Sequence, residues 1–303
     1  MKKDKIKGSL MLFIAAFVWG TSFAAQTTAA KYVDAFTFNA CRSFVAAAFL
    51  WVVICVRDRE KPKEKYATKE LNPYFAGLVC GSVWFVGINL QQAGITAYPP
   101  EAAASGRAAF LSATYVVIVA LAAWFKNKKI HPLVLVATLT CVAGMYLLCA
   151  SEGLSGIYLG DVLELIGAVG FSVQIILIDR FSKVDGIKFS FMQFIVCGCL
   201  SLLCSFIFEN PSLKNIALAL LPLLFAGILS SGIGNTLQIL GQKYAEPAVA
   251  SIIMSLESVF GAFAGWMLLD ERLSYLEIFG CVLVFVSVIL TQLPDLLQRR
   301  SNK

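Results

Sequence analysis

Ten long apolar segments constrain this 303-residue chain more than any other feature. Each has about 20 residues, the length that an α-helix needs to cross the hydrocarbon core of a bilayer. Lipid offers no partner to backbone polar groups, and the runs are too long and too uniformly apolar for barrel strands, so they are predicted to be helices. With 58% hydrophobic and 15% charged residues, a soluble fold has too little polar surface to cover them. The segments are Leu10–Ala29, Ala35–Val56, Tyr74–Ala93, Ala103–Phe125, Leu133–Ala150, Gly160–Ile178, Phe189–Phe208, Ala217–Leu240, Val249–Leu269 and Leu276–Leu293.

The basic residues are distributed unevenly between the connecting segments. With the N-terminus in the cytoplasm, 20 of the 25 Lys and Arg residues are cytoplasmic, three are outside, and Arg42 and Arg107 lie within spans. Because basic residues accumulate on the cytoplasmic side, this split predicts ten spans with both termini in the cytoplasm of a bacterial cell. The net charge of +6 then faces an anionic inner leaflet and needs no nucleic-acid partner.

The chain carries traces of an internal duplication. The matching pairs are LQQAGITA (Leu90–Ala97) with LQILGQKYA (Leu237–Ala245), and WFKNKKIHP (Trp124–Pro132) with WMLLDERLSY (Trp266–Tyr275). Five spans thus resemble the next five, which predicts one repeat over residues 1–150 and another over 151–303. Because five is odd, the second repeat is expected to be inverted in the bilayer. Inverted repeats that enclose a central site are typical of alternating-access transporters.

Four further stretches are informative by their order along the chain. They are WGTSFAAQ (Trp19–Gln26), FTFNACR (Phe36–Arg42), GRAAFLSATYVVIVAL (Gly106–Leu121) and SLESVFGAFAGWMLLDERLS (Ser255–Ser274). Together they resemble the drug/metabolite transporter superfamily, specifically its EamA-type ten-span members, over nearly the whole chain. Ser258 stands where that pattern often has the Pro of a kink, and Lys128 stands where the second half keeps Glu271. The resemblance implies a transporter with a central cavity between the halves and leaves the substrate open.

Charged residues within the spans are the first candidates for function, because a charge inside a bilayer is costly. Glu257, eight residues into the ninth segment, is a candidate proton carrier or partner for a substrate amine. Arg107 has a planar fork suited to a carboxylate; it is expected to bind a substrate anion, to pair with Glu257, or to reach the outer interface. A zwitterion such as an amino acid would satisfy both charges if the two residues share one cavity. Arg42 and Glu164 can approach the outer interface and are interpreted as structural.

Polar and aromatic side chains recur on single helix faces, as in Trp19, Ser22 and Gln26 at the i, i+3, i+7 spacing. Such a stripe either lines a cavity for a polar or aromatic solute or forms interhelical hydrogen bonds. The predicted substrate-binding or coupling residues are Glu257, Arg107, Trp19, Gln26, Trp84, Gln91, Tyr115, Gln174, Asn235 and Gln238.

Residues that many enzymes need are scarce. His131 is the only histidine, which argues against Ser-His-Asp, Cys-His and His-zinc sites, and there is no phosphate-binding GxxxxGK loop. We therefore expect no cofactor, metal or catalytic residue. Together with the inverted repeat, the resemblance implies a secondary active exporter of small organic solutes such as amino acids, metabolites or drugs. Its expected partners are that solute, with proton coupling as an option, and the lipid bilayer; the protein is expected to be a monomer or a weak homodimer. An intramembrane lipid-modifying enzyme and a non-transporting scaffold are the alternatives.

Overall fold

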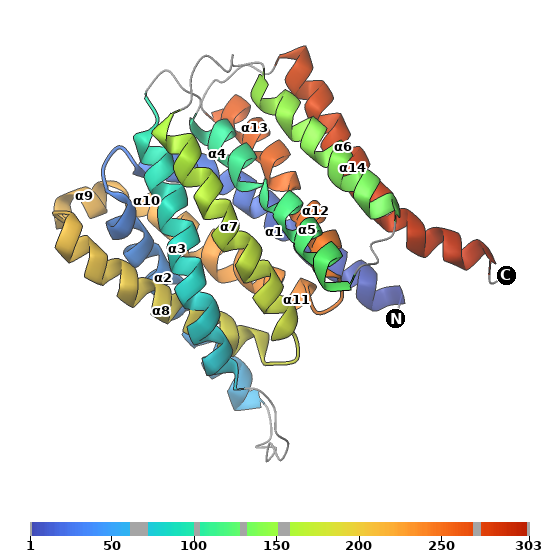
Figure 1. The fold of residues 1–303 in the computed structure, drawn as a ribbon. Coiled ribbons are helices and arrows are strands. Elements are labelled where there is room, and N and C mark those ends of the chain that lie inside the picture. The colour runs from blue at the N-terminus through green and yellow to red at the C-terminus, as the bar shows by residue number, and fades with distance from the viewer. Residues whose placement is uncertain are drawn as a thin grey trace.

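The computed structural model describes residues 2–60, 72–99, 104–127, 132–150, 158–268 and 274–301, and every regular element in them is a helix (Figure 1). The elements are α1 (Lys2–Ala29), α2 (Ala35–Glu60), α3 (Pro73–Ala97), α4 (Ala104–Ser112), α5 (Tyr115–Asn127), α6 (Pro132–Ala150), α7 (Leu159–Arg180), α8 (Gly186–Phe208), α9 (Leu213–Leu218), α10 (Leu220–Leu224), the π-helix η1 (Phe225–Asn235), α11 (Thr236–Gly241), α12 (Pro247–Met254), α13 (Leu256–Leu268) and α14 (Tyr275–Ser301).

Eight helical segments in these residues are long and apolar enough to cross a membrane, and Pro132–Leu147 and Ile278–Leu290 are shorter apolar helices. The prediction of an all-α membrane protein is thereby confirmed. The expectations placed on Lys128, His131 and Glu271 lie outside the described residues.

Many large apolar side chains lie on the outside of the protein and many polar side chains lie inside, which is the reverse of the distribution in soluble proteins. Large apolar side chains face outward, with Phe208 exposed by 71% and Leu221 by 80%, whereas Gln92 and Gln193 are fully buried. A lipid environment explains both, because hydrocarbon covers apolar side chains while buried polar groups find partners between helices.

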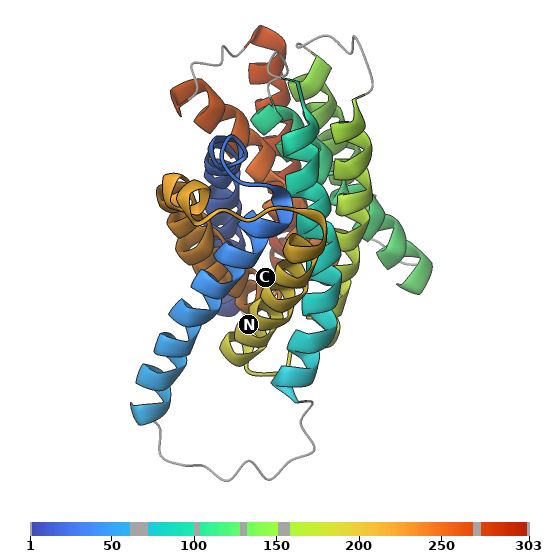
Figure 2. The same ribbon diagram turned by 90° about the vertical axis from the view of Figure 1, so that its left-hand side faces the viewer.

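The long helices run side by side as one bundle (Figures 1 and 2). The helix α3 packs against both α7 and α8, α1 packs against α13 and η1, and α6 lies along α14. Helices from the first half of the chain therefore contact helices from the second half throughout the bundle.

Two of the predicted continuous spans are interrupted near their middle. The fourth divides between Ser112 and Tyr115, and the ninth divides at Ser255. At the first break the Thr114 hydroxyl donates to the Leu111 carbonyl at 2.6 Å; at the second the Ser258 hydroxyl donates to Ser255 O at 2.7 Å. Such back-bonding of Ser and Thr bends helices. The ninth span is therefore interrupted without the proline that the family pattern often has.

The eighth span is also not a uniform α-helix, because η1 occupies eleven residues of it. A π-helix is wider than an α-helix and is frequent at functional sites. Gly227 lies where an added Cβ would be 2.5 Å from Val45, so this glycine permits η1 to pack closely on α2.

Gly20 permits a close approach of α1 to α13. A Cβ on this residue would lie 2.6 Å from the Glu257 carbonyl oxygen and 2.8 Å from the Gly261 nitrogen. Both are backbone atoms of one helix, so they cannot move aside as a side chain can.

We expect Gly20→Ala to reduce stability, since overpacking costs about 1–3 kcal/mol. Thermal denaturation in detergent would show a lower Tm than wild type. Gly106→Ala is the matched control, because a Cβ there meets nothing within 4 Å. Equal Tm values for the two variants would contradict this packing.

A charged cluster ties α2 to the start of α8. Arg57 donates to both carboxylate oxygens of Asp185, at 3.0 and 2.8 Å, and Lys188 pairs with Asp58 at 2.9 Å. Burial raises the pKa of the Asp185 carboxyl, but hydrogen bonds from Arg57 and from backbone N–H groups outweigh it, so this pKa lies below its ordinary value. Asp185 is therefore an anion that links the two helices.

Candidate functional site

A cavity lies between helices of both halves of the chain. It encloses about 460 Å³ of space free of protein atoms, part of it open to solvent. The lining residues are Trp19, Phe23, Gln26, Arg42, Trp84, Ile88, Gln91, Tyr115, Phe171, Gln174, Ile175, Ser230, Gln238, Met254 and Glu257. All residues predicted for binding or coupling from the sequence are among them except Arg107 and Asn235.

Glu257 is located at the break of the ninth span, in the first turn of α13. Its side chain is buried, with 5% of the residue exposed. The helix N-terminus offers partial positive charge to a carboxylate in this position. No basic side chain among the described residues interacts with it. Glu257 is thus a carboxyl group in the cavity without a cationic partner.

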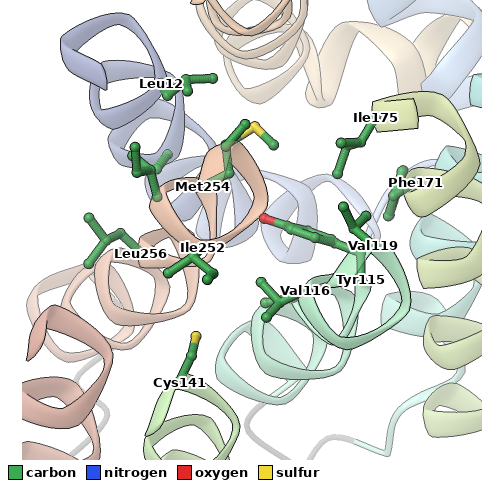
Figure 3. Packing of buried hydrophobic residues seen from close by; sticks show 14 of the residues in the cluster. Leu12, Tyr115, Val116, Val119, Cys141, Phe171, Ile175, Ile252, Met254 and Leu256 are labelled. Atoms are coloured by element: carbon green, nitrogen blue, oxygen red, sulfur yellow. The ribbon is translucent and has the colours of Figure 1, made fainter. Parts of the chain in front are cut away.

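Tyr115 approaches Glu257 from the other interrupted span. Figure 3 shows its hydroxyl pointing from α5 toward the segment that carries Met254. The hydroxyl interacts with the Glu257 carboxyl, yet it makes no hydrogen bond of ordinary geometry in this conformation.

Arg42 also lines the cavity, which corrects the interpretation of this residue as one that approaches the outer interface. It is 3% exposed. Its Nε donates to Ser231 Oγ at 3.0 Å and its Nη1 donates to Gln26 Oε1 at 3.2 Å. The guanidinium lies 5.6 Å from the Phe38 ring centroid, and no carboxylate of the described residues interacts with it. Neutral groups therefore orient Arg42 and leave its charge uncompensated.

Arg107 is placed differently from the hypothesis that paired it with Glu257. Its Nε and Nη2 donate to the two carboxylate oxygens of Asp161, at 2.6 and 2.7 Å. The Tyr98 hydroxyl donates to the same carboxylate at 2.9 Å, and the Tyr158 ring lies 4.8 Å from the guanidinium. Arg107 therefore belongs to a cluster between α3, α4 and α7, outside the residues that line the cavity.

The buried amides serve in two ways. Gln174 and Gln238 donate to each other across the cavity wall, at 3.4 and 3.2 Å. Asn235 is fully buried away from the cavity, where its Oδ1 accepts from Gln193 Nε2 at 3.3 Å. For such polar side chains the sequence left two roles open, cavity lining and interhelical hydrogen bonding. Asn235 has the second role.

Aromatic side chains form much of the remaining wall. Trp84 and Phe171 have ring centroids 5.3 Å apart, and Trp19 Nε1 donates to the Ser230 carbonyl of η1 at 3.1 Å. Phe171 was not among the residues predicted for binding or coupling, although it lies near Gln174 on the same helix. The Phe-x-x-Gln of α1 (Phe23, Gln26) recurs in α7 (Phe171, Gln174), and all four residues line the cavity.

No group of three or more His, Cys, Asp or Glu side chains suited to a metal ion occurs within the residues that the structure describes. The cavity instead presents one carboxyl group, one guanidinium, several amides and aromatic rings. This set suits an organic solute.

A protein-family model and two curated relatives resemble this chain over most of its length. The model of the EamA-like transporter family matches residues 6–150 and again residues 158–293. An uncharacterized transporter of Archaeoglobus fulgidus is 25% identical over 95% of this chain and 87% of its own length. The uncharacterized transporter YoaV of Bacillus subtilis is 21% identical over 92% and 94%.

A solved crystal structure supports the fold. It superimposes with a TM-score of 0.76 over 98% of this chain and 99% of its own, at 20% sequence identity. Together with the two matches of the family model, the apolar helices and the cavity, these similarities lead to one conclusion. The chain belongs to the EamA-like transporter family and is a membrane transporter.

Proposed function

We propose that this protein is a secondary active transporter that exports a small zwitterionic solute across the cytoplasmic membrane by alternating access. The substrate carboxylate binds Arg42 and its ammonium group binds Glu257. Ten spans in two inverted repeats, over residues 1–150 and 151–303 and with both termini cytoplasmic, surround the site.

The observation that carries this proposal is the presence in one cavity of a guanidinium and a carboxyl group, neither of which has an oppositely charged partner among the described residues. A buried charge is costly to leave without a partner. A ligand that brings an ammonium group and a carboxylate supplies both partners at once. The zwitterion hypothesis from the sequence is thus kept, with Arg42 in the role assigned to Arg107.

The aromatic wall favours a substrate with an apolar or aromatic side chain. An ammonium group near Trp19 or Trp84 gains from the negative face of the ring in addition to Glu257. Phe23 and Phe171 offer apolar surface to the rest of the solute.

Matching residues of the two halves support the repeat. When Trp124 is aligned with Trp266, as in the duplicated segments, Tyr115 aligns with Glu257 and the break of the fourth span aligns with that of the ninth. Two equivalent halves built this way can exchange conformations about a central site.

Alternating access also needs contacts that open at each end of the bundle. Arg107–Asp161 joins α4 to α7, and Arg57–Asp185 joins α2 to the start of α8. In the proposed topology these pairs lie near the outer and the cytoplasmic face, respectively. Each links the two halves, so their separate opening would expose the cavity to one side at a time.

Counterflow into proteoliposomes tests the proposal. Vesicles loaded with unlabelled phenylalanine are mixed with labelled phenylalanine, with phenethylamine, which lacks the carboxylate, or with 3-phenylpropionate, which lacks the amine; leucine and its two analogues form a second series. We expect the zwitterions to exchange at least tenfold faster than either partial analogue. Exchange of only the anions or only the amines would refute the zwitterion site. Absence of flux together with turnover of a lipid would favour the intramembrane enzyme.

A further inference from the structure

A second carboxyl group, Glu164 of α7, is buried between α3, α4 and α7, and no part of it is exposed. This corrects the expectation that it approaches the interface. Its Oε2 accepts a hydrogen bond from the Ser112 hydroxyl at 2.7 Å, whereas its Oε1 has no hydrogen-bond partner. That free oxygen lies against Gly94 of α3, where an added Cβ would be 3.0 Å away. A carboxyl group with one open oxygen at this depth is not explained by packing alone.

Glu164 is connected to the cavity through Ser112. Gln91, which lines the cavity, donates to Ser112 Oγ at 2.8 Å, and Ser112 in turn donates to Glu164. Glu164 also interacts electrostatically with Glu257. Two carboxylates that repel each other favour states in which one of them holds a proton.

Glu164 is connected to the end of the bundle through Asp161, which lies one turn earlier on α7. At this end of the bundle, Arg107 and Tyr98 both donate to the Asp161 carboxylate. Tyr98 also interacts electrostatically with Glu164. The other described helices that pack on α7, α5 and α12, bring no titratable group to Glu164. Among the described residues, the charged or titratable groups around Glu164 are therefore those of the cavity and of this end cluster.

We propose that Glu164 is a proton relay between the outer solution and Glu257. When the Arg107–Asp161 cluster opens, the Glu164 carboxylate takes a proton from outer water. The proton later leaves Glu164 by way of the Ser112 hydroxyl and cavity water, one O–H bond breaking as the next forms, and reaches the Glu257 carboxylate. Protonation of Glu257 releases the substrate ammonium group, so inward proton movement drives export. This inference rests on the proposed function.

The test separates exchange of substrate from proton coupling. Proteoliposomes with the wild-type protein, Glu164→Gln or Ser112→Ala are assayed for phenylalanine counterflow at equal pH. The same vesicles are then assayed for accumulation driven by an imposed pH gradient, with a trapped pH-sensitive dye that reports proton flux. For both variants we expect counterflow within about threefold of wild type, and gradient-driven accumulation and proton flux reduced at least tenfold. Asp179→Asn, on the same helix, should change neither.

Each other outcome has a distinct meaning. Wild-type counterflow without proton flux, or full coupling in both variants, would overturn the relay and leave the proposed transporter intact. Equal loss of counterflow and coupling in both variants would assign Glu164 to folding or to substrate binding and would also overturn the relay. Absence of wild-type counterflow in the phenylalanine and leucine series alike would instead refute the proposed function.

Discussion

Glu257→Gln is expected to reduce phenylalanine counterflow about thirtyfold or more. The change keeps the shape of the side chain and removes only the negative charge that the ammonium group would meet. Loss of a desolvated charge pair costs about 2–5 kcal/mol, and each 1.4 kcal/mol is tenfold in affinity. Because no basic residue of the described chain pairs with Glu257, the free protein should be no less stable after the change. Counterflow and Tm, measured on one preparation, report both quantities.

Glu246→Gln provides the control for Glu257→Gln. Glu246 is an exposed carboxyl at the start of the same interrupted span, and its side chain caps nothing. The Glu246→Gln variant should show the same rate of phenylalanine counterflow as wild type. If Glu257→Gln kept more than a third of wild-type counterflow for every amine and amino acid in both series, Glu257 would be a packing residue.

The sequence predicted the helical membrane architecture well because hydrophobicity and length determine it. The interruptions were not predictable in the same way. Neither the fourth nor the ninth segment has a proline at its break, where hydroxyl groups instead donate to backbone carbonyls. The π-helix η1 depends on glycines that fit against α1 and α2, which is a tertiary contact.

The candidate site was predicted in part for a similar reason. Stripes on helix faces located Trp19, Gln26 and Gln238, because spacing along one helix shows which residues share a face. The depth of a charged residue along its span predicts the position and partners of its side chain less well. It placed Arg42 near the interface, although the residue lines the cavity. It also offered Glu257 as the partner of Arg107 in place of Asp161, which is 54 positions away in sequence.

Arg42→Gln is expected to change specificity as well as rate. Phenylalanine counterflow should fall about thirtyfold or more, because a bidentate donor for the carboxylate is removed from a buried site. Phenethylamine has no carboxylate, so its weaker exchange should stay within about threefold of wild type. Arg42→Lys should recover little, since an ammonium group lacks the planar fork.

The comparison of phenylalanine with phenethylamine distinguishes a substrate-binding role of Arg42 from a purely structural role. Arg42 donates to Gln26 and Ser231, so a purely structural role predicts that Arg42→Gln slows both compounds equally and lowers the Tm. Arg59→Gln, at the exposed end of the same helix, is the matched control and should resemble wild type. Selective loss of the zwitterion with retained amine exchange follows only if the guanidinium binds the substrate carboxylate. An equal loss of both would return Arg42 to the structural role that the sequence suggested.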